Sequence, residues 1–248
     1  MTLDRKKQPE FGRIEEINLQ EPKVVHLDNG IPVLCIDAGT QNVLKIELVF
    51  DAGTSTSNKI LVASTAVKTL TEGTSNRTAK EIAESVDFYG SYLQNEVSHD
   101  ESSICLYSLN KHLDKTLETL SEVYSTPTFP TKEIETVLKK SQQEMLVNQE
   151  KVSYLGAKAF SSALYGKDHP YGRSADVEDY DKIGPKDLAN FHASRVKNSI
   201  KYILVAGKLG EDTVSNLNTF FGSEERIESE KIDVDGAGIE ASSIHVNK

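Results

Sequence analysis

The chain has 248 residues, of which 38% are hydrophobic, and a formal net charge of -10. A chain of this length can bury a full core, as one large domain or two small ones. The negative charge argues against nucleic acid or an anionic membrane as the main partner, because both would repel it. The simpler interpretation is that the charge serves solubility alone.

Cysteine content and hydropathy exclude further classes of protein. The two cysteines, Cys35 and Cys105, lie inside apolar runs, so their number excludes a disulfide framework or a zinc site built on thiolates. The N-terminus lacks the apolar segment of a signal peptide, and no apolar run reaches membrane-spanning length. We therefore expect a cytoplasmic protein with no membrane partner, unless a leader has been removed.

Turn residues predict the first strands. Residues 1–20 are polar and are interpreted as an N-terminal arm. Residues 24–36 hold two strand-like runs around Asp28-Asn29-Gly30, which favours a hairpin. Residues 43–50 alternate as a third strand. A strand hairpin that leads into a helix indicates an α+β domain.

Residues 61–74 are predicted to form a short helix. Apolar residues recur there at helical spacing, namely Ile60, Ala63, Val67 and Leu70. This spacing places Thr65, Lys68 and Thr69 together on the opposite, polar stripe. Gly73 is expected to end the helix as its C-cap.

Helices and strands alternate over the rest of the chain. The expected helices run from Thr78 to Tyr89, from Asn110 to the proline-containing break at 126–130, from Thr131 to about Gln149, from Ser153 to Tyr165, from Gly184 to Ala193 and from Asp212 to Phe220. The expected strands are 91–98, 102–109 and 202–206. This order predicts an α+β fold in which helices pack on a mainly antiparallel sheet.

The short helix, followed by Gly73, Thr74 and Arg77, resembles a known one. It is similar to the helix on which insulinase-like zinc peptidases, the pitrilysin and mitochondrial processing peptidase family, carry the inverted motif His-x-x-Glu-His. Further segments that share the resemblance are the DNGIPV hairpin, the Asp51-Ala52-Gly53-Thr54 turn, the helix over 81–90, the break at 127–130, the HPYG loop, residues 198–207 and Phe221-Gly222. The resemblance implies one insulinase-family half-domain over residues 21–222. Residues 223–248 would then be a linker and the start of a second half-domain that is absent.

The positions of the metal motif differ from the family pattern. Residues 65–69 read Thr-Ala-Val-Lys-Thr, so both histidine ligands and the glutamate that activates water are replaced. The resemblance places Glu144 at the position of the family's third ligand. A catalytic zinc ion needs three protein ligands, and Lys68 would repel a dication. We therefore predict a vestigial site of Thr65, Lys68, Thr69 and Glu144, with no catalytic residue, metal or other cofactor.

Simpler interpretations of these residues remain open. A polar stripe is typical of the solvated face of an amphipathic helix, and Glu144 is spaced to pair with Lys140 on a helix surface. His99 is not expected to bind a metal together with its neighbours Asp100 and Glu101, because adjacent strand residues point to opposite faces of the sheet. The family's asparagine that seats the substrate backbone falls on Gln94, with Asn95 beside it.

Charge predicts how the vestigial site is rebuilt. A partly buried carboxylate without its cation is costly. We therefore expect Lys68 to contact Glu144, directly or through one water, and Thr65 or Thr69 to donate a hydroxyl hydrogen bond to the same carboxylate. The alternative is that both charged side chains point separately into solvent.

The resemblance leaves three functions. In the first, which we favour, the chain is a non-catalytic subunit of a two-component zinc metallopeptidase: it pairs with an active homologous subunit and forms part of the chamber that holds the peptide. In the second, it is a structural scaffold of the same fold with no peptidase partner. In the third, it is an active hydrolase with an unrecognised centre.

Overall fold

A mainly antiparallel sheet frames the computed structural model, which describes residue 12 and residues 19–227. The strands are β1 (Lys23–His26), β2 (Pro32–Asp37), β3 (Val43–Phe50), β4 (Tyr92–Val97), β5 (Ser102–Leu109) and β6 (Ile200–Gly207). They form one six-stranded sheet in the order β1-β2-β6-β3-β5-β4. The β2–β6 pair is parallel and the other pairs are antiparallel. The predicted α+β class is confirmed.

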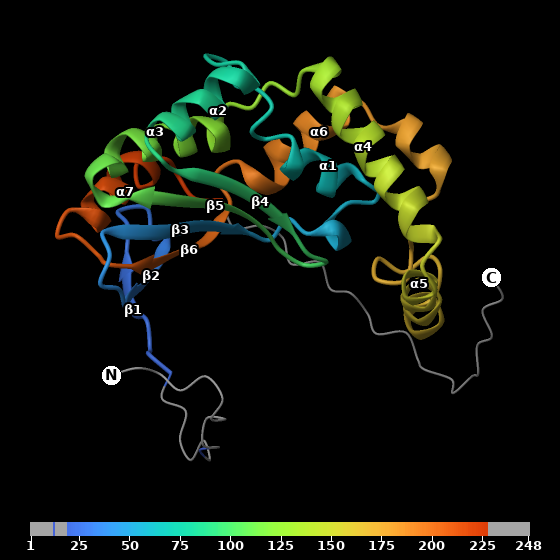
Figure 1. Ribbon diagram of the computed structural model, residues 1–248, viewed down its shortest axis with the longest axis horizontal. Coiled ribbons are helices and arrows are strands. Elements are labelled where there is room, and N and C mark those ends of the chain that lie inside the picture. The colour runs from blue at the N-terminus through green and yellow to red at the C-terminus, as the bar shows by residue number, and fades with distance from the viewer. Residues whose placement is uncertain (1–11, 13–18, 228–248) are drawn as a thin grey trace, which may run out of the picture.

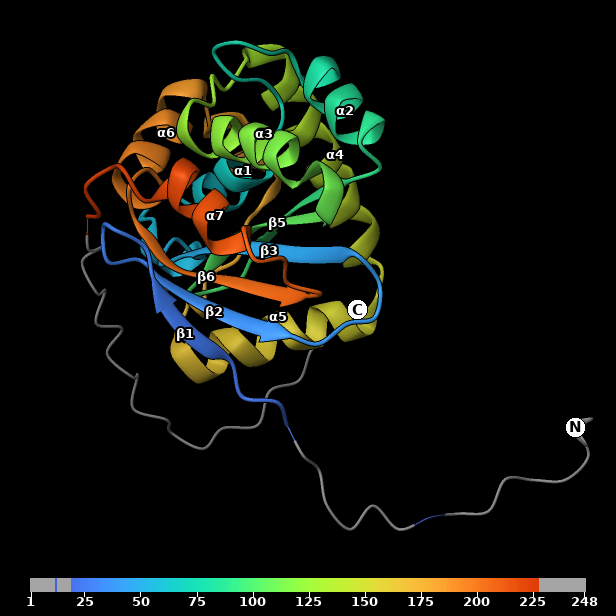
Figure 2. The same ribbon diagram turned by 90° about the vertical axis from the view of Figure 1, so that its left-hand side faces the viewer.

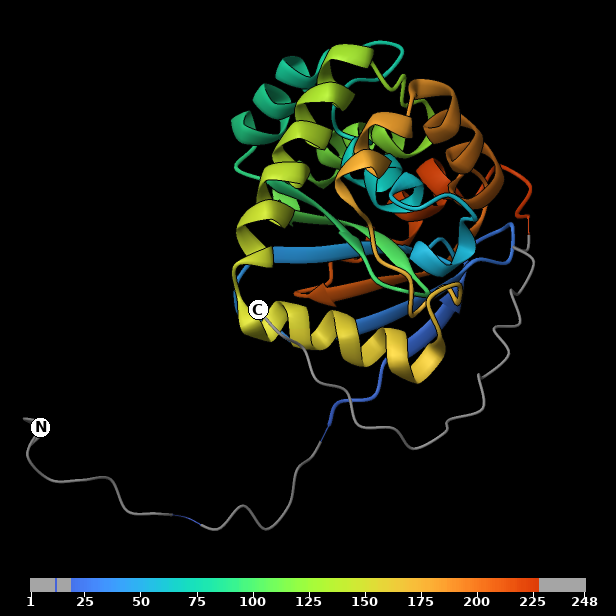
Figure 3. The same cartoon turned by 90° about the vertical axis from the view of Figure 1, so that its right-hand side faces the viewer.

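Six helices cover one face of this sheet. They are α1 (Val62–Lys68), α2 (Ala79–Phe88), α3 (Leu113–Ser125), α4 (Thr131–Gln149), α6 (Pro185–Phe191) and α7 (Thr213–Phe221). Figure 1 shows them above the strands, and Figures 2 and 3 show α5 (Val152–Tyr165) toward the opposite, open side. No helix in the described part of the chain combines the length and apolar character needed to cross a bilayer.

The core lies between the sheet and the six helices. Leu44, Ile46 and Leu48 alternate along β3 and are fully buried on the helix side, as a central strand with one covered face requires. Most of the predicted arm, residues 1–20, and most of the predicted linker, residues 223–248, lie outside the described residues. The described domain contains the predicted 21–222 segment.

Local turn and cap residues explain several element boundaries. Gly30 has a φ of +83°, which glycine adopts without strain, and the predicted hairpin forms around it. Thr78 and Glu81 form a reciprocal capping box at the start of α2. The predicted cap at Asn110 is wrong, because its amide donates to the Lys208 carbonyl instead. A 3₁₀ turn, η2 (Asn110–His112), therefore precedes α3.

His192 begins a π-helical turn, η4 (His192–Val196), and links it to α3. Its Nε2–H donates to the Tyr124 carbonyl at 2.7 Å. The ring is buried, and burial lowers the pKa of His192 from 6.5 because the charged form would lose its hydration. As the pH falls below the unfolded-state value, the unfolded chain therefore takes up this proton before the folded one does.

We therefore expect the contribution of His192 to the free energy of unfolding to be constant above about pH 6.5. Below that pH, the free energy of unfolding should decrease as the pH falls toward about 5. Urea unfolding of wild-type protein and His192→Gln across this range measures the effect. The variant is expected to lose part of the decrease, whereas His26→Gln, on the exposed β1, keeps it. An identical pH profile for wild type and His192→Gln would contradict this role.

Candidate functional site

Helix α1 is enclosed by other elements on more sides than its sequence pattern predicts. It packs against β4, α4 and α6. Thr65 is 4% exposed and Thr69 is fully buried, whereas Lys68 is exposed. The predicted solvated stripe is therefore wrong for both threonines and correct for Lys68. A buried threonine is tolerated here because the Thr69 hydroxyl donates to the Thr65 carbonyl at 2.7 Å.

The helix is also shorter than predicted. It begins after Leu61, whose φ is +69°, and ends at Lys68, with Thr69 in the C-cap position. The predicted C-cap role of Gly73 is therefore wrong. Gly73 lies in the following loop with a φ of +143°, and a Cβ atom there would approach Pro130 Cγ to 3.1 Å. The glycine serves a close approach between loops, not the helix end.

The expected rebuilding of the vestigial site is not seen as a direct contact. Among the described residues, no hydrogen bond or ion pair joins Lys68 to Glu144, and Glu144 does not pair with Lys140. Glu144 is exposed on α4. Because the Thr69 hydroxyl is committed to its own helix, the predicted donation to Glu144 is wrong for this residue. A contact through one water stays a prediction.

Tyr180 is a neighbour of Glu144 that the sequence did not indicate. Burial raises the pKa of Tyr180, and the nearby Tyr154 and Glu144 raise it further. Its hydroxyl donates to the Ser141 carbonyl of α4 at 3.4 Å. The carboxylate of Glu144 therefore lies near a phenol that stays protonated, and among the described residues it belongs to no group that could hold a metal.

The residues that the resemblance aligns with the metal motif do not fit a zinc ion. Thr65 and Thr69 offer neutral hydroxyl oxygens, and Lys68 brings a positive charge beside them. Within the part of the chain that the structure describes, no group of three or more histidine, cysteine, aspartate or glutamate side chains is placed to hold a metal. The donor set supports no metal-dependent step.

The outer edge of the sheet next to α1 is formed by β4, the last strand in the order, and no described strand covers it. Leu93 and Asn95 pair with the fully buried Leu106 and Ile104, so they lie on the helix side. Gln94 faces the open side, where its Nε2 donates to Glu96 at 2.8 Å. Asn95, and not the predicted Gln94, therefore shares a side with α1.

The Asn95 side chain is incompletely satisfied. Its Oδ1 atom is buried and accepts no hydrogen bond from the described residues. A buried amide oxygen without a donor is unusual in proteins and calls for a partner. This oxygen lies on the side of β4 that faces α1.

A loop holds the β4–β5 hairpin and the approach to α1 together. Tyr171, from the HPYG segment, donates to the Asp100 carboxylate at the hairpin tip, which raises the pKa of Tyr171 to about 12. Arg173 donates to the carbonyls of Asn58 at 3.1 Å and Thr54 at 3.0 Å, and also to that of Ser57. The sequence indicated a structural HPYG loop but carried no signal for the role of Arg173.

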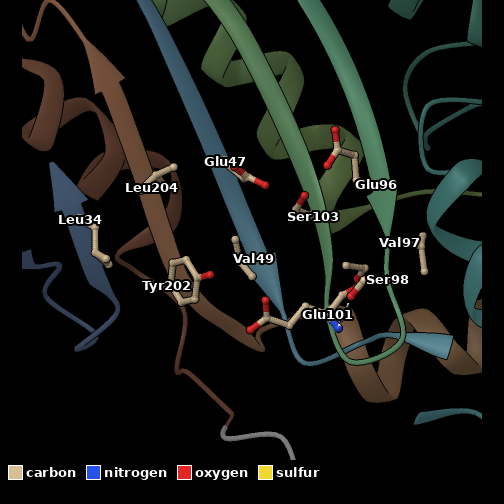
Figure 4. Close-up of a pocket in the computed structure, with 11 residues that line it drawn as sticks. Leu34, Glu47, Val49, Glu96, Val97, Ser98, Glu101, Ser103, Tyr202 and Leu204 are labelled. Atoms are coloured by element: carbon tan, nitrogen blue, oxygen red, sulfur yellow. Dashed lines mark hydrogen bonds between the residues drawn. The ribbon is translucent and has the colours of Figure 1, made fainter. Parts of the chain in front are cut away.

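The open face of the sheet carries a hollow of about 370 Å³. Figure 4 shows Glu47 and Val49 of β3 in its middle, with Leu34 and Leu204 on one side and Glu96 and Glu101 on the other. Two of these carboxylates have cations, since Glu47 pairs with Lys45 at 2.8 Å and Glu101 with Lys201 at 2.7 Å. Among the described residues that line it, Glu47 and Glu101 are therefore held as ion pairs and do not form a poised acid–base pair.

Comparison with models of known protein families shows to which family this chain is related. The model of the insulinase family (peptidase family M16) matches residues 33–174, more than half of the chain. The chain belongs to the insulinase family. A relative, an uncharacterized zinc protease of Rickettsia felis, is 25% identical over 205 residues, which are 79% of this chain and 49% of that protein. This insulinase-family chain therefore spans about half the length of the relative.

Solved structures share the fold. The inactive domain of a peptidase M16 from Pseudomonas fluorescens has a TM-score of 0.80 at 21% identity, over 87% of this chain and 54% of that one. A protease from Helicobacter pylori has a TM-score of 0.73 at 19% identity, over 90% and 54%. The first half of the periplasmic protease PqqL from Escherichia coli has a TM-score of 0.75 at 14% identity, over 88% and 49%. The predicted half-domain fold is confirmed.

Proposed function

We propose that this chain is a non-catalytic insulinase-family half-domain that pairs with an active homologous peptidase and forms one wall of the chamber that holds the peptide. The observation that carries the proposal is the state of α1. Helix α1 lies beside the edge strand β4 and against α4. The residues that the resemblance aligns with the family's ligands and base are Thr65, Lys68 and Thr69.

The peptide-binding part of the proposal rests on the edge of β4. An extended peptide can add to a free edge through backbone hydrogen bonds, and side-chain pockets then supply specificity. Asn95 Oδ1, which accepts no hydrogen bond from the residues that the structure describes, lies on the helix side of this edge. A chamber closed by two complementary halves would also exclude water from the bound peptide.

The proposed partnership with a second subunit is supported by the length of this chain and by its similarity to halves of longer proteins. The chain covers about half of each relative and structure named above, and one of those structures is of an inactive domain. A scaffold without a peptidase partner would share this fold but would need no open peptide-binding edge. The two functions therefore predict different peptide turnover when this chain is mixed with an active homologous peptidase.

The test is the turnover of a peptide by an insulinase-family protein with an intact His-x-x-Glu-His motif, measured with and without this chain. We expect turnover to rise several-fold on addition of the wild-type chain, and less with Asn95→Ala. Gln94→Ala, which alters the opposite face of the same strand, is the matched control and should stimulate like wild type. Equal turnover with and without the chain would leave only the scaffold function.

A further inference from the structure

A second cleft, separate from the hollow on the open face, lies between α2 and β4. Its volume is about 300 Å³, at the lower end of the roughly 300–1,000 Å³ typical of small-ligand pockets, so it suits one long side chain. Its lining includes Glu72, Ile82, Val86, Asp87 and Leu93. Ile82 and Val86 are buried and give it an apolar wall.

Glu72 is the unexplained group in this cleft. It is partly buried, and within residues 12 and 19–227 its carboxylate has neither a hydrogen-bond donor nor a cation. Burial raises the pKa of Glu72, and the negative charge of Glu133 raises it further. Lys68, four residues earlier, is exposed and forms no ion pair with it. A carboxylate in this setting is stabilised by any cation that enters the cleft.

We propose that the cleft is a subsite for a lysine or arginine side chain of a peptide that lies along β4, with Glu72 binding its positive charge. The aliphatic stem would cover Ile82 and Val86, as long basic side chains do on apolar surfaces. The charged end would meet Glu72, and the exposed carboxylate of Asp87 adds negative potential nearby.

Strand geometry supplies the placement. In a peptide paired with β4, alternate side chains point to the helix side of the sheet. Leu93 lies on that side and also lines the cleft. The side chain beside Leu93 therefore enters the cleft, and the neighbouring side chains point to the open face. The subsite rests on the proposed function, since it requires a peptide at this edge.

The test is fluorescence anisotropy with short labelled peptides that differ only in a central lysine, norleucine or glutamate. Norleucine keeps the aliphatic stem without the charge. We expect the wild-type chain to bind the lysine peptide on the order of tenfold more tightly than the norleucine peptide, and the glutamate peptide most weakly. Glu72→Gln should remove the preference for lysine. Glu135→Gln, an exposed residue of α4 outside the cleft, should keep it.

Glu72→Lys provides a second variant with an opposite expected result, because it should bind the glutamate peptide more tightly than the lysine peptide. Circular dichroism of each variant establishes that it is folded. Equal binding of the lysine and norleucine peptides, or a lysine preference that persists in Glu72→Gln, would overturn the subsite and leave the proposed function standing. Failure of every peptide to bind would overturn both.

Discussion

Replacing Arg173 by alanine is expected to lower the free energy of unfolding by about 3 kcal/mol, because hydrogen bonds from a charged donor contribute more than neutral ones. The guanidinium group donates to the carbonyls of Thr54, Ser57 and Asn58, in the segment that leads to α1. Without it, the partly buried carbonyls of Thr54 and Ser57 and the exposed carbonyl of Asn58 lose a shared donor. The loss should loosen the start of α1 as well as destabilise the whole domain.

Urea unfolding of wild type, Arg173→Ala and Arg173→Lys measures the effect. Lysine keeps the charge but cannot match the planar fork of donors, so Arg173→Lys should recover only part of the stability. Lys167→Ala, at an exposed position in the same loop, should unfold like wild type. A loss below about 1 kcal/mol in Arg173→Ala would show that other contacts hold the loop.

The purified chain is expected to retain far less than one zinc ion per molecule after dialysis against zinc-containing buffer, and to hydrolyse no peptide. The positions that the resemblance aligns with the metal motif supply the hydroxyls of Thr65 and Thr69 and the ammonium group of Lys68, whereas zinc requires imidazole, thiolate or carboxylate ligands. A single carboxylate at Glu144 cannot hold the ion alone.

Plasma mass spectrometry of the dialysed protein gives the metal content, and digestion of a broad peptide library gives the activity. An insulinase-family protein with an intact motif, treated in the same way, is the positive control and should carry about one zinc ion per catalytic site. A comparable zinc content in this chain would mean that ligands outside the motif positions form a metal centre.

Local sequence signals predicted the elements whose residues lie close together in the chain. The hairpin predicted at the Asp28-Asn29-Gly30 turn formed, and the helix predicted from Thr78 begins there, with Thr78 as its N-cap. The mainly antiparallel sheet followed from the order of such elements. The parallel pairing of β2 with β6 joins residues far apart in the sequence, and no local signal indicated it.

The environment of the vestigial site depends on distant packing and was predicted less well. Thr65 and Thr69 look like surface residues from helical periodicity, but both are buried where α1 packs against α4, α6 and β4. The family resemblance pointed to Gln94, while the register of β4 with β5 puts Asn95 on the side of α1. Arg173 acts on carbonyl groups more than a hundred residues earlier, as in its bond to Thr54. Every residue has a backbone carbonyl, so the sequence does not indicate which carbonyls accept a hydrogen bond from a distant side chain.

Hydrogen exchange of β4 with and without peptide tests most directly whether this chain binds peptides at an intact edge without cleaving them. The amides of residues 92–97 on the free edge should exchange more slowly in the presence of excess peptide and zinc, because the added strand takes them as donors. The mass spectrum of the same samples should show the peptide intact. Unchanged exchange in β4, or the appearance of peptide fragments, would contradict the account.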